Sequence, residues 1–211
     1  MTTIEKIVVL AKAIPAKHLI HGEITCVAGI SLGDNKWRRL HPVPTSLLSK
    51  SYFMKFSIIE VEVDKWIGQH QRPEDRHLVN YVGCSGRMND WKNQRAFLEG
   101  HVDRSVDFII SSGRSLGIVK PTIEDFYRDA NGRLRYRFRD AANNPYNLVC
   151  REWEALALAN KYPDPRDFKK VKSKFCEWMI EKRDPYFVIG TTADNVTKMV
   201  VAVHYPPKTK S

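Results

Sequence analysis

Short strand-like segments follow one another along this chain, and turn residues separate them. Residues 56–65 show the pattern best, because Ile59, Val61 and Val63 alternate with acidic residues, as in a strand that is buried on one face. Segments 123–128 and 133–139 flank an Asn-Gly pair, which predicts a hairpin. About eight or nine such strands occur without a regular strand–helix alternation. The chain is therefore predicted to form small β-barrels or a compact β-rich α+β fold rather than a doubly wound sheet.

Between these strands, the helix start and stop signals of the sequence predict only about three or four helices. Asn89 or Asp90 can cap a helix that runs to about Gly100, and residues 147–160 contain no Gly or Pro and favour a second helix. Asp167 can cap a third, and Trp153 and Trp178 are interpreted as core residues. The apolar stripe of the third helix consists of Phe168, Val171, Phe175, Trp178 and Met179.

The charge of the chain is positive and unevenly spread. With 43% hydrophobic residues the composition is that of a folded protein, yet 34 Lys and Arg stand against 24 Asp and Glu, a net charge of +10. Residues 1–50 carry +4 and residues 131–183 carry +6, whereas residues 51–130 carry −1 and residues 184–211 carry +1. Two basic blocks around a neutral middle favour an anionic partner, either nucleic acid or an acidic protein.

The most specific basic feature is an arginine at every second position of a predicted strand. Because side chains alternate along a strand, Arg133, Arg135, Arg137 and Arg139 are expected on one face and three apolar residues on the other. A phosphate backbone is a natural counterion for such a row. The alternative is a solvated strand whose neighbour supplies acids, for instance Glu124 or Asp125.

Two further basic groups are candidates for the same function. In the segment Lys36-Trp37-Arg38-Arg39, Trp37 can stack on a base while the basic residues contact phosphates, although a core tryptophan fits equally well. Lys169, Lys170 and Lys174 lie on the polar side of the third predicted helix, where lysines are ordinarily just solvated.

Signals for catalysis are weak. Glu60, Glu62 and Asp64, followed by Lys65, are compatible with the acidic strand of a metal-dependent nuclease and equally with an exposed strand face. The chain contains no P-loop, no dinucleotide fingerprint and no nucleophile elbow. Its four cysteines are far apart, which argues against a disulfide framework or a cysteine zinc site. No catalytic residue, metal site or cofactor is predicted, and a non-enzymatic role is favoured.

Membrane and export signals are not evident. No apolar run reaches the roughly 18 residues that cross a bilayer. The opening segment lacks a basic region before its short apolar run and is typical of a first strand rather than a signal peptide. A cytoplasmic location is therefore expected.

Several short stretches resemble a known family. The opening Lys6-Ile-Val-Val-Leu-Ala-Lys is one of them, and the others are residues 37–44, 150–159, 186–191 and 203–207. Together they look like the dual OB domain-containing proteins of prokaryotes. The resemblance implies two OB-like barrels, nucleic-acid binding and a place in bacterial antiviral defence or mobile-element systems. It supplies no catalytic residues.

We therefore expect a β-rich α+β chain of two small OB-like β-barrel subdomains with a few helices. Their predicted bounds are residues 1–88 and 113–211, joined by a helical segment at 89–112, with two helices in the second subdomain. The predicted function is non-enzymatic binding of nucleic acid, DNA or RNA, with single strands favoured. The alternatives are a protein-interaction subunit that docks an acidic partner or effector enzyme within a complex, and a divergent metal-dependent nuclease.

Overall fold

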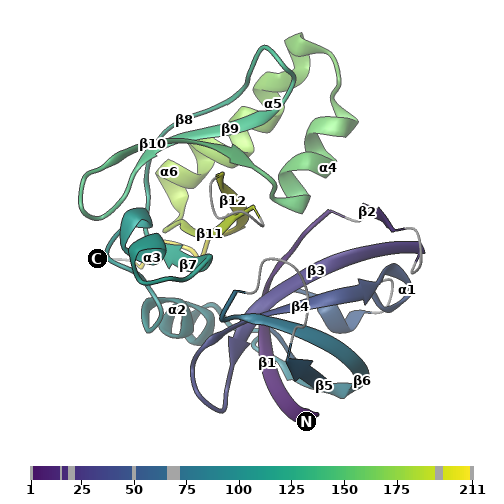
Figure 1. Cartoon of the computed structure of the whole chain (residues 1–211). Coiled ribbons are helices and arrows are strands. Elements are labelled where there is room, and N and C mark those ends of the chain that lie inside the picture. Colours follow the sequence, from purple (N-terminus) through teal and green to yellow (C-terminus); the bar gives the residue numbers. More distant parts are fainter. Residues whose placement is uncertain are drawn as a thin grey trace. The chain divides into compact units, whose positions relative to one another are not determined.

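The chain folds into two compact units, Met1–Asn93 and Gln94–Ser211. The structure is a computed structural model, and it describes residues 2–14, 16–18, 22–48, 51–65, 72–192 and 197–209. Figure 1 shows the strands and helices that make up each unit. The division falls inside helix α2 (Trp91–Glu99), within the segment for which the sequence predicts a connecting helical region. Asp90 accepts the Asn93 amide at 2.8 Å and so supports the start of this helix.

The described residues of the first unit form six strands and two short helical turns ahead of α2. They are β1 (Thr3–Lys12), β2 (Ala16–His18), β3 (Gly22–Ser31), β4 (Trp37–Pro44), α1 (Thr45–Leu48), η1 (Ser51–Phe53), β5 (Ser57–Lys65) and β6 (Asp75–Arg87).

Strand pairing closes the first unit into a barrel. The sheet order is β1-β5-β6-β4-β3-β2, and an additional β1–β3 pairing joins its ends into a ring. Without the short β2, the ring runs β1-β3-β4-β6-β5 and back to β1. When these five strands are numbered by their order in the chain, their order around the ring is 1-2-3-5-4. The third and fifth strands, β4 and β6, pair in parallel. α1 and η1 lie between the third and fourth strands. This is the topology of an OB barrel.

The alternation predicted for residues 56–65 is confirmed in β5. Ile59, Val61 and Val63 are buried, and the acidic residues between them are partly exposed. The three side chains join Ile7 and Leu40 in the core of the barrel. Hydrophobic burial on one face of each strand therefore holds this unit together.

The second unit contains six strands in its described residues, and its largest helical segment spans residues 153–182. The elements after α2 are α3 (Val106–Ser111), β7 (Leu116–Val119), β8 (Thr122–Arg128), β9 (Leu134–Arg139), β10 (Pro145–Cys150), α4 (Trp153–Lys161), η2 (Pro165–Asp167), α5 (Phe168–Lys172), η3 (Ser173–Glu177), α6 (Trp178–Lys182), β11 (Tyr186–Thr191) and β12 (Lys198–His204).

The second unit repeats the topology of the first. Its sheet order is β7-β11-β12-β10-β9-β8, and β10 runs parallel to β12. β7 and β8 stand at opposite ends of this sheet, but only two residues separate them in the chain, so together they act as one bent first strand. The strands then have the sequential order 1-2-3-5-4, and β9 is the second strand. The predicted fold of two small OB-like barrels with a few helices is confirmed.

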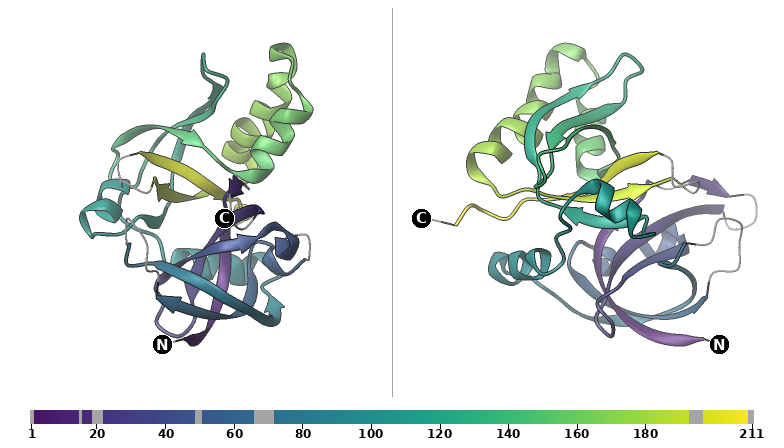
Figure 2. Two further views of the ribbon diagram at one scale, coloured as in Figure 1. Left: turned by 45° about the vertical axis from the view of Figure 1, so that its right-hand side comes forward. Right: turned by 60° about the vertical axis from the view of Figure 1, so that its left-hand side comes forward.

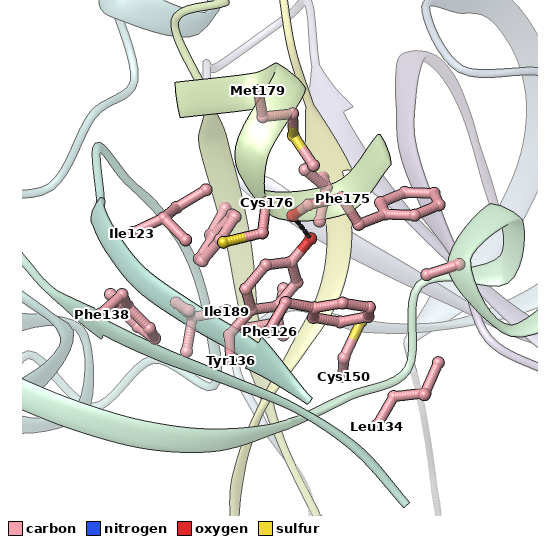
Figure 3. Packing of buried hydrophobic residues seen from close by; sticks show 14 of the residues in the cluster. Ile123, Phe126, Leu134, Tyr136, Phe138, Cys150, Phe175, Cys176, Met179 and Ile189 are labelled. Atoms are coloured by element: carbon pink, nitrogen blue, oxygen red, sulfur yellow. Dashed lines mark hydrogen bonds between the residues drawn. The ribbon is translucent and has the colours of Figure 1, made fainter. Parts of the chain in front are cut away.

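Helices α4, α5 and α6 lie to one side of the β8–β9–β10 strands (Figures 1 and 2). Val171, Phe175 and Met179 are buried in the same core as Phe126 and Tyr136 of β8 and β9 (Figure 3). η3 is a wider, π-helical turn within this helical segment. Its Phe175 carbonyl accepts the buried Tyr136 hydroxyl at 2.9 Å. The turn thus provides the partner that a buried hydroxyl requires.

Replacing Tyr136 by Phe is expected to lower the free energy of unfolding by about 1–2 kcal/mol, because the Phe175 carbonyl would remain buried without its donor. Urea denaturation measures this change. A Tyr52→Phe variant is the control, since Tyr52 is 39% exposed and its hydroxyl is not locked in a core. Equal stability of the two variants would contradict this role for Tyr136.

Two expectations for the second half are wrong. Residues 147–160 do not form one helix, because Asn147 and Val149 pair with β9 and the helix begins only at Trp153. Trp153 is 40% exposed and is not a core residue.

In the described part of the chain, no helix combines the length and the apolar character that a membrane crossing would need.

Candidate nucleic-acid interface

The arginine row of β9 lies on the outer face of the second barrel. Leu134, Tyr136 and Phe138 are buried, whereas the arginines between them project away from the core. The side chains of Arg133, Arg137 and Arg139 are 42–53% exposed, and that of Arg135 is 20% exposed. The turn before β9 has Gly132 at φ 75°, a conformation that favours glycine, so the predicted Asn-Gly hairpin is present.

Each arginine of the row has a carboxylate nearby. Arg139 contacts Glu124 at 2.8 Å and Arg137 lies 3.8 Å from Asp125, so the acids across the hairpin that the alternative interpretation requires are present. Asp129 in the turn serves both Arg133, at 3.0 Å, and Arg135, at 3.6 Å. Neighbouring guanidinium groups at about 6.6 Å repel by about 0.6 kcal/mol in water, and the acids offset this repulsion.

The row keeps an excess of positive charge in spite of these acids. Burial opposes the ionisation of Asp125, but the Lys172 ammonium at 2.7 Å and the Phe126 amide hold its pKa below the ordinary value. Burial also opposes ionisation of Asp129, and bonds from Arg133 hold that pKa low. Both carboxylates are therefore charged at neutral pH. Five cations face three carboxylates here: Arg133, Arg135, Arg137, Arg139 and Lys172 against Glu124, Asp125 and Asp129.

A β-bulge brings an aromatic residue onto the same face. The β8–β9 register shifts between Ile123, opposite Phe138, and Asp125, opposite Arg137, so Glu124 is the extra residue. Strict alternation from the buried Ile123 would turn Tyr127 inward. With the bulge, Tyr127 lies opposite Arg135 and projects outward, and the Arg137 guanidinium carbon is 5.7 Å from its ring centroid.

Asn147 of β10 completes this group. Its Oδ1 accepts from Arg135 Nε at 2.9 Å, and its amide lies within hydrogen-bond distance of the Tyr127 hydroxyl, with Oδ1 at 3.0 Å and Nδ2 at 2.7 Å. The sequence interpretation missed both residues, since period two places Tyr127 on the wrong face and Asn147 falls in a predicted helix. The arginine row and the Asn-Gly hairpin are the sequence signals that point to this neighbourhood.

The helix lysines are exposed but separate from the row. Lys169, Lys170 and Lys174 all lie on the polar side of α5 and η3, as expected. Lys170 pairs with Asp167 at 2.8 Å, and its ammonium lies 4.7 Å from the Tyr162 ring centroid. Among these helices it is Lys172 that reaches the β8 edge, through Asp125.

The first basic block does not form the patch that the sequence predicts. Trp37, Arg38 and Arg39 are only 6%, 6% and 7% exposed. Arg38 contacts Glu5 at 2.5 Å and Asp34 at 2.9 Å, and Arg39 contacts Asp75 at 3.0 Å. Their charges are therefore compensated inside the first unit, and Trp37 presents no free ring face for stacking. Lys36, in the turn before β4, is exposed.

The acids of β5 are spread along the outer face of that strand. Glu60, Glu62 and Asp64 alternate on the outer face of the strand, and Lys6 pairs with Glu60 at 2.8 Å. Within the ranges that the structure describes, no three His, Cys, Asp or Glu side chains gather as metal ligands would.

Residues 3–100 match the profile of a protein family described as a domain of unknown function (DUF8758). The match covers the first barrel and α2. No curated protein matches the chain.

Solved structures with a similar chain path include several HIN domains. The HINa domain of Ifi202 in complex with 20-base-pair double-stranded DNA has 8% identity and a TM-score of 0.40, with 100% of both chains covered. The HINb domain of p204 has 11% identity and a TM-score of 0.41 over 96% of this chain and 95% of that one. The tetrameric HIN2 domain of p202 has 12% identity and a TM-score of 0.39 over 98% and 92%.

Proposed function

We propose that this chain is a non-enzymatic nucleic-acid-binding module whose contact surface is the outer face of β8, β9 and β10. One observation carries the proposal: three arginines of β9, and Arg133 directly before it, project at alternate positions with an excess of positive charge around them. Each guanidinium presents a planar set of donors that suits phosphate oxygens. The row is therefore arranged to follow a phosphate backbone.

The carboxylates beside the row do not prevent such binding. Ion pairs between side chains as exposed as Arg139 and Glu124 contribute about 0–1 kcal/mol. A guanidinium that turns from such a pair to a phosphate gives up little, and it releases a condensed counterion from the nucleic acid. The acids then act as partners of the arginines in the free protein.

The position of the row in the barrel agrees with this proposal by fold analogy. OB barrels bind oligonucleotides on the face of their second and third strands, which here are β9 and β10. This face suits an extended single strand, and we propose single-stranded nucleic acid as the preferred ligand. Lys169, Lys170, Lys174 and Lys36 remain secondary candidates for phosphate contacts, whereas their burial removes Trp37, Arg38 and Arg39.

The biological setting is proposed from the resemblance alone. We infer an accessory role in a prokaryotic defence or mobile-element system, in the cytoplasm and in the company of a protein partner. That partner would leave the arginine face open to nucleic acid.

A salt titration of binding tests the proposed function. Fluorescently labelled single- and double-stranded DNA and RNA are titrated with the whole chain at several salt concentrations. If all four arginines contact phosphates, the slope of log affinity against log salt is expected to be about −3 for single strands.

Two results bear on the alternatives. Affinity that does not change with salt, or no binding at low salt, would contradict the proposal and favour an acidic protein partner. Adding Mg²⁺ or Mn²⁺ to the same samples tests the nuclease alternative, and intact strands after incubation are the expected result.

A further inference from the structure

Tyr127 reaches across the middle strand of the arginine face. It starts on β8, and its hydroxyl meets the side chain of Asn147 on β10, with β9 between the two. Adjacent strands are about 4.8 Å apart, so the two side chains and the hydrogen bond between them together span roughly two strand spacings. The ring therefore lies over β9, between Arg135, which contacts Asn147, and Arg137, whose guanidinium carbon is 5.7 Å from the ring centroid.

The neighbours of Asn147 determine which way its amide points. A guanidinium can only donate, so the amide atom that meets Arg135 Nε at 2.9 Å is the oxygen. The Nδ2 group then faces the Tyr127 hydroxyl at 2.7 Å and uses one of its two hydrogens there. In the described part of the chain no acceptor takes the second hydrogen, and Asn147 is exposed. One oriented donor is left for a ligand beside an aromatic ring.

We propose that Tyr127 and Asn147 form a contact site for an unpaired nucleobase. The base stacks on the Tyr127 ring, the free Asn147 amide hydrogen bonds to an acceptor on the base edge, and the arginines on either side hold the flanking phosphates. This inference rests on the proposed function and adds the part of the ligand, an unpaired base, that the site contacts. A base within a duplex has its faces stacked and its pairing edge occupied, so the site selects single strands.

The site accounts for two features that phosphate binding alone does not require. A tyrosine is present between two arginines, where any small polar residue would suffice for a phosphate track. The β8 bulge at Glu124 is what turns that tyrosine outward. Every base has a ring face and at least one edge acceptor, so contact at this site tolerates different sequences.

The test compares single- and double-stranded binding in variants of Tyr127. The probe is a single strand of about 12 nucleotides, within the range that one OB barrel covers, with 2-aminopurine at internal positions. The unmodified chain is expected to change the fluorescence of one 2-aminopurine position by stacking. Tyr127→Leu is expected to abolish that change and to weaken single-strand binding roughly tenfold, with duplex binding and the salt slope unchanged.

Two further variants serve as controls. Tyr127→Phe keeps the ring and loses the hydroxyl, so it should retain the fluorescence change and stay within about threefold of the original affinity. Tyr52→Leu alters an exposed tyrosine of the other unit and should behave as the unmodified chain does.

The possible failures are distinguishable. If Tyr127→Leu binds single strands as the unmodified chain does, with the same fluorescence change, the base site is overturned while arginine-dependent binding stands. If Tyr127→Leu weakens single- and double-strand binding equally, the residue supports the face and does not read a base, and the inference again fails. If the unmodified chain binds no nucleic acid, the proposed function fails and this site fails with it.

Discussion

Reversing two charges of the arginine row, Arg135→Glu with Arg137→Glu, is expected to weaken single-strand binding by roughly a hundredfold at moderate salt. Each arginine loses a hydrogen bond to a charged group that contributes about 1.5 kcal/mol, and the two together give about 3 kcal/mol. The salt slope should become shallower by about 1.4, since two fewer counterions are released per complex. Fluorescence anisotropy at four or five salt concentrations measures both quantities.

The matched control is Arg166→Glu with Lys182→Glu. It changes the net charge of the second unit by the same amount, and like the row both residues pair with a nearby acid, Asp164 and Glu181. Arg166 is 91% exposed and lies outside the β8–β10 face. Affinity should fall less than about threefold, because distant exposed charges are screened. Equal losses in the two double variants would show that total charge, rather than the row, governs binding.

A milder pair separates binding from folding. Arg135 is the least exposed arginine of the row and contacts Asn147, so a glutamate there also disturbs the face. Arg135→Gln with Arg137→Gln keeps polar side chains of similar length and should retain the unfolding midpoint of the original chain. A large loss of affinity in this variant, at unchanged stability, would assign the effect to the interface.

Much of the fold can be predicted from local sequence patterns. The period-two burial of β9 and of Ile59, Val61 and Val63 in β5 follows directly from residue order, because one face of each strand meets a core. The β8–β9 hairpin follows from a turn that needs a positive φ at Gly132. Each of these features depends on neighbours within about 10 residues, the range over which pattern arguments hold.

Features that depend on distant partners were not predictable in the same way. Arg38 is buried because Glu5 meets it from 33 residues away, and Arg39 is buried because Asp75 meets it from 36 residues away. Without those carboxylates, the desolvation of either guanidinium would be costly, and exposure was the natural expectation. Pairing of Val149 with Met199 of the distant β12 also helps to make β10 a strand, where residue 147 onward favours a helix.

The candidate site shows the same division. The arginine row was identified from the sequence, since it needs only the alternation of one strand. Tyr127 was missed because a single extra residue at Glu124 reverses the faces of β8, and nothing local marks that bulge. The two barrels share their strand order because of how their strands pair in space, and no sequence repeat indicates this similarity.

The barrel of the first unit should be most sensitive at Gly29, where Gly29→Ala is expected to lower the free energy of unfolding by about 3 kcal/mol or more. A Cβ at this position would lie 2.2 Å from the Val8 carbonyl oxygen and 2.7 Å from Ile7 Cγ2. The nearest atom is the backbone oxygen of Val8, in the buried half of β1, so no side-chain rotation relieves the clash. β1 must move away from β3, and that pairing is the one that closes the ring.

Urea denaturation and amide hydrogen exchange in β1 and β3 would measure this effect, with faster exchange at the β1–β3 amides as its local signature. Gly83→Ala is the matched control, because it lies in β6 of the same barrel and an added Cβ there meets nothing within 4 Å. Its stability should stay within about 0.5 kcal/mol of the original. If Gly29→Ala were equally silent, the close β1–β3 approach would not be needed to hold the barrel shut, and closure would have to depend on the β4–β6 pair instead.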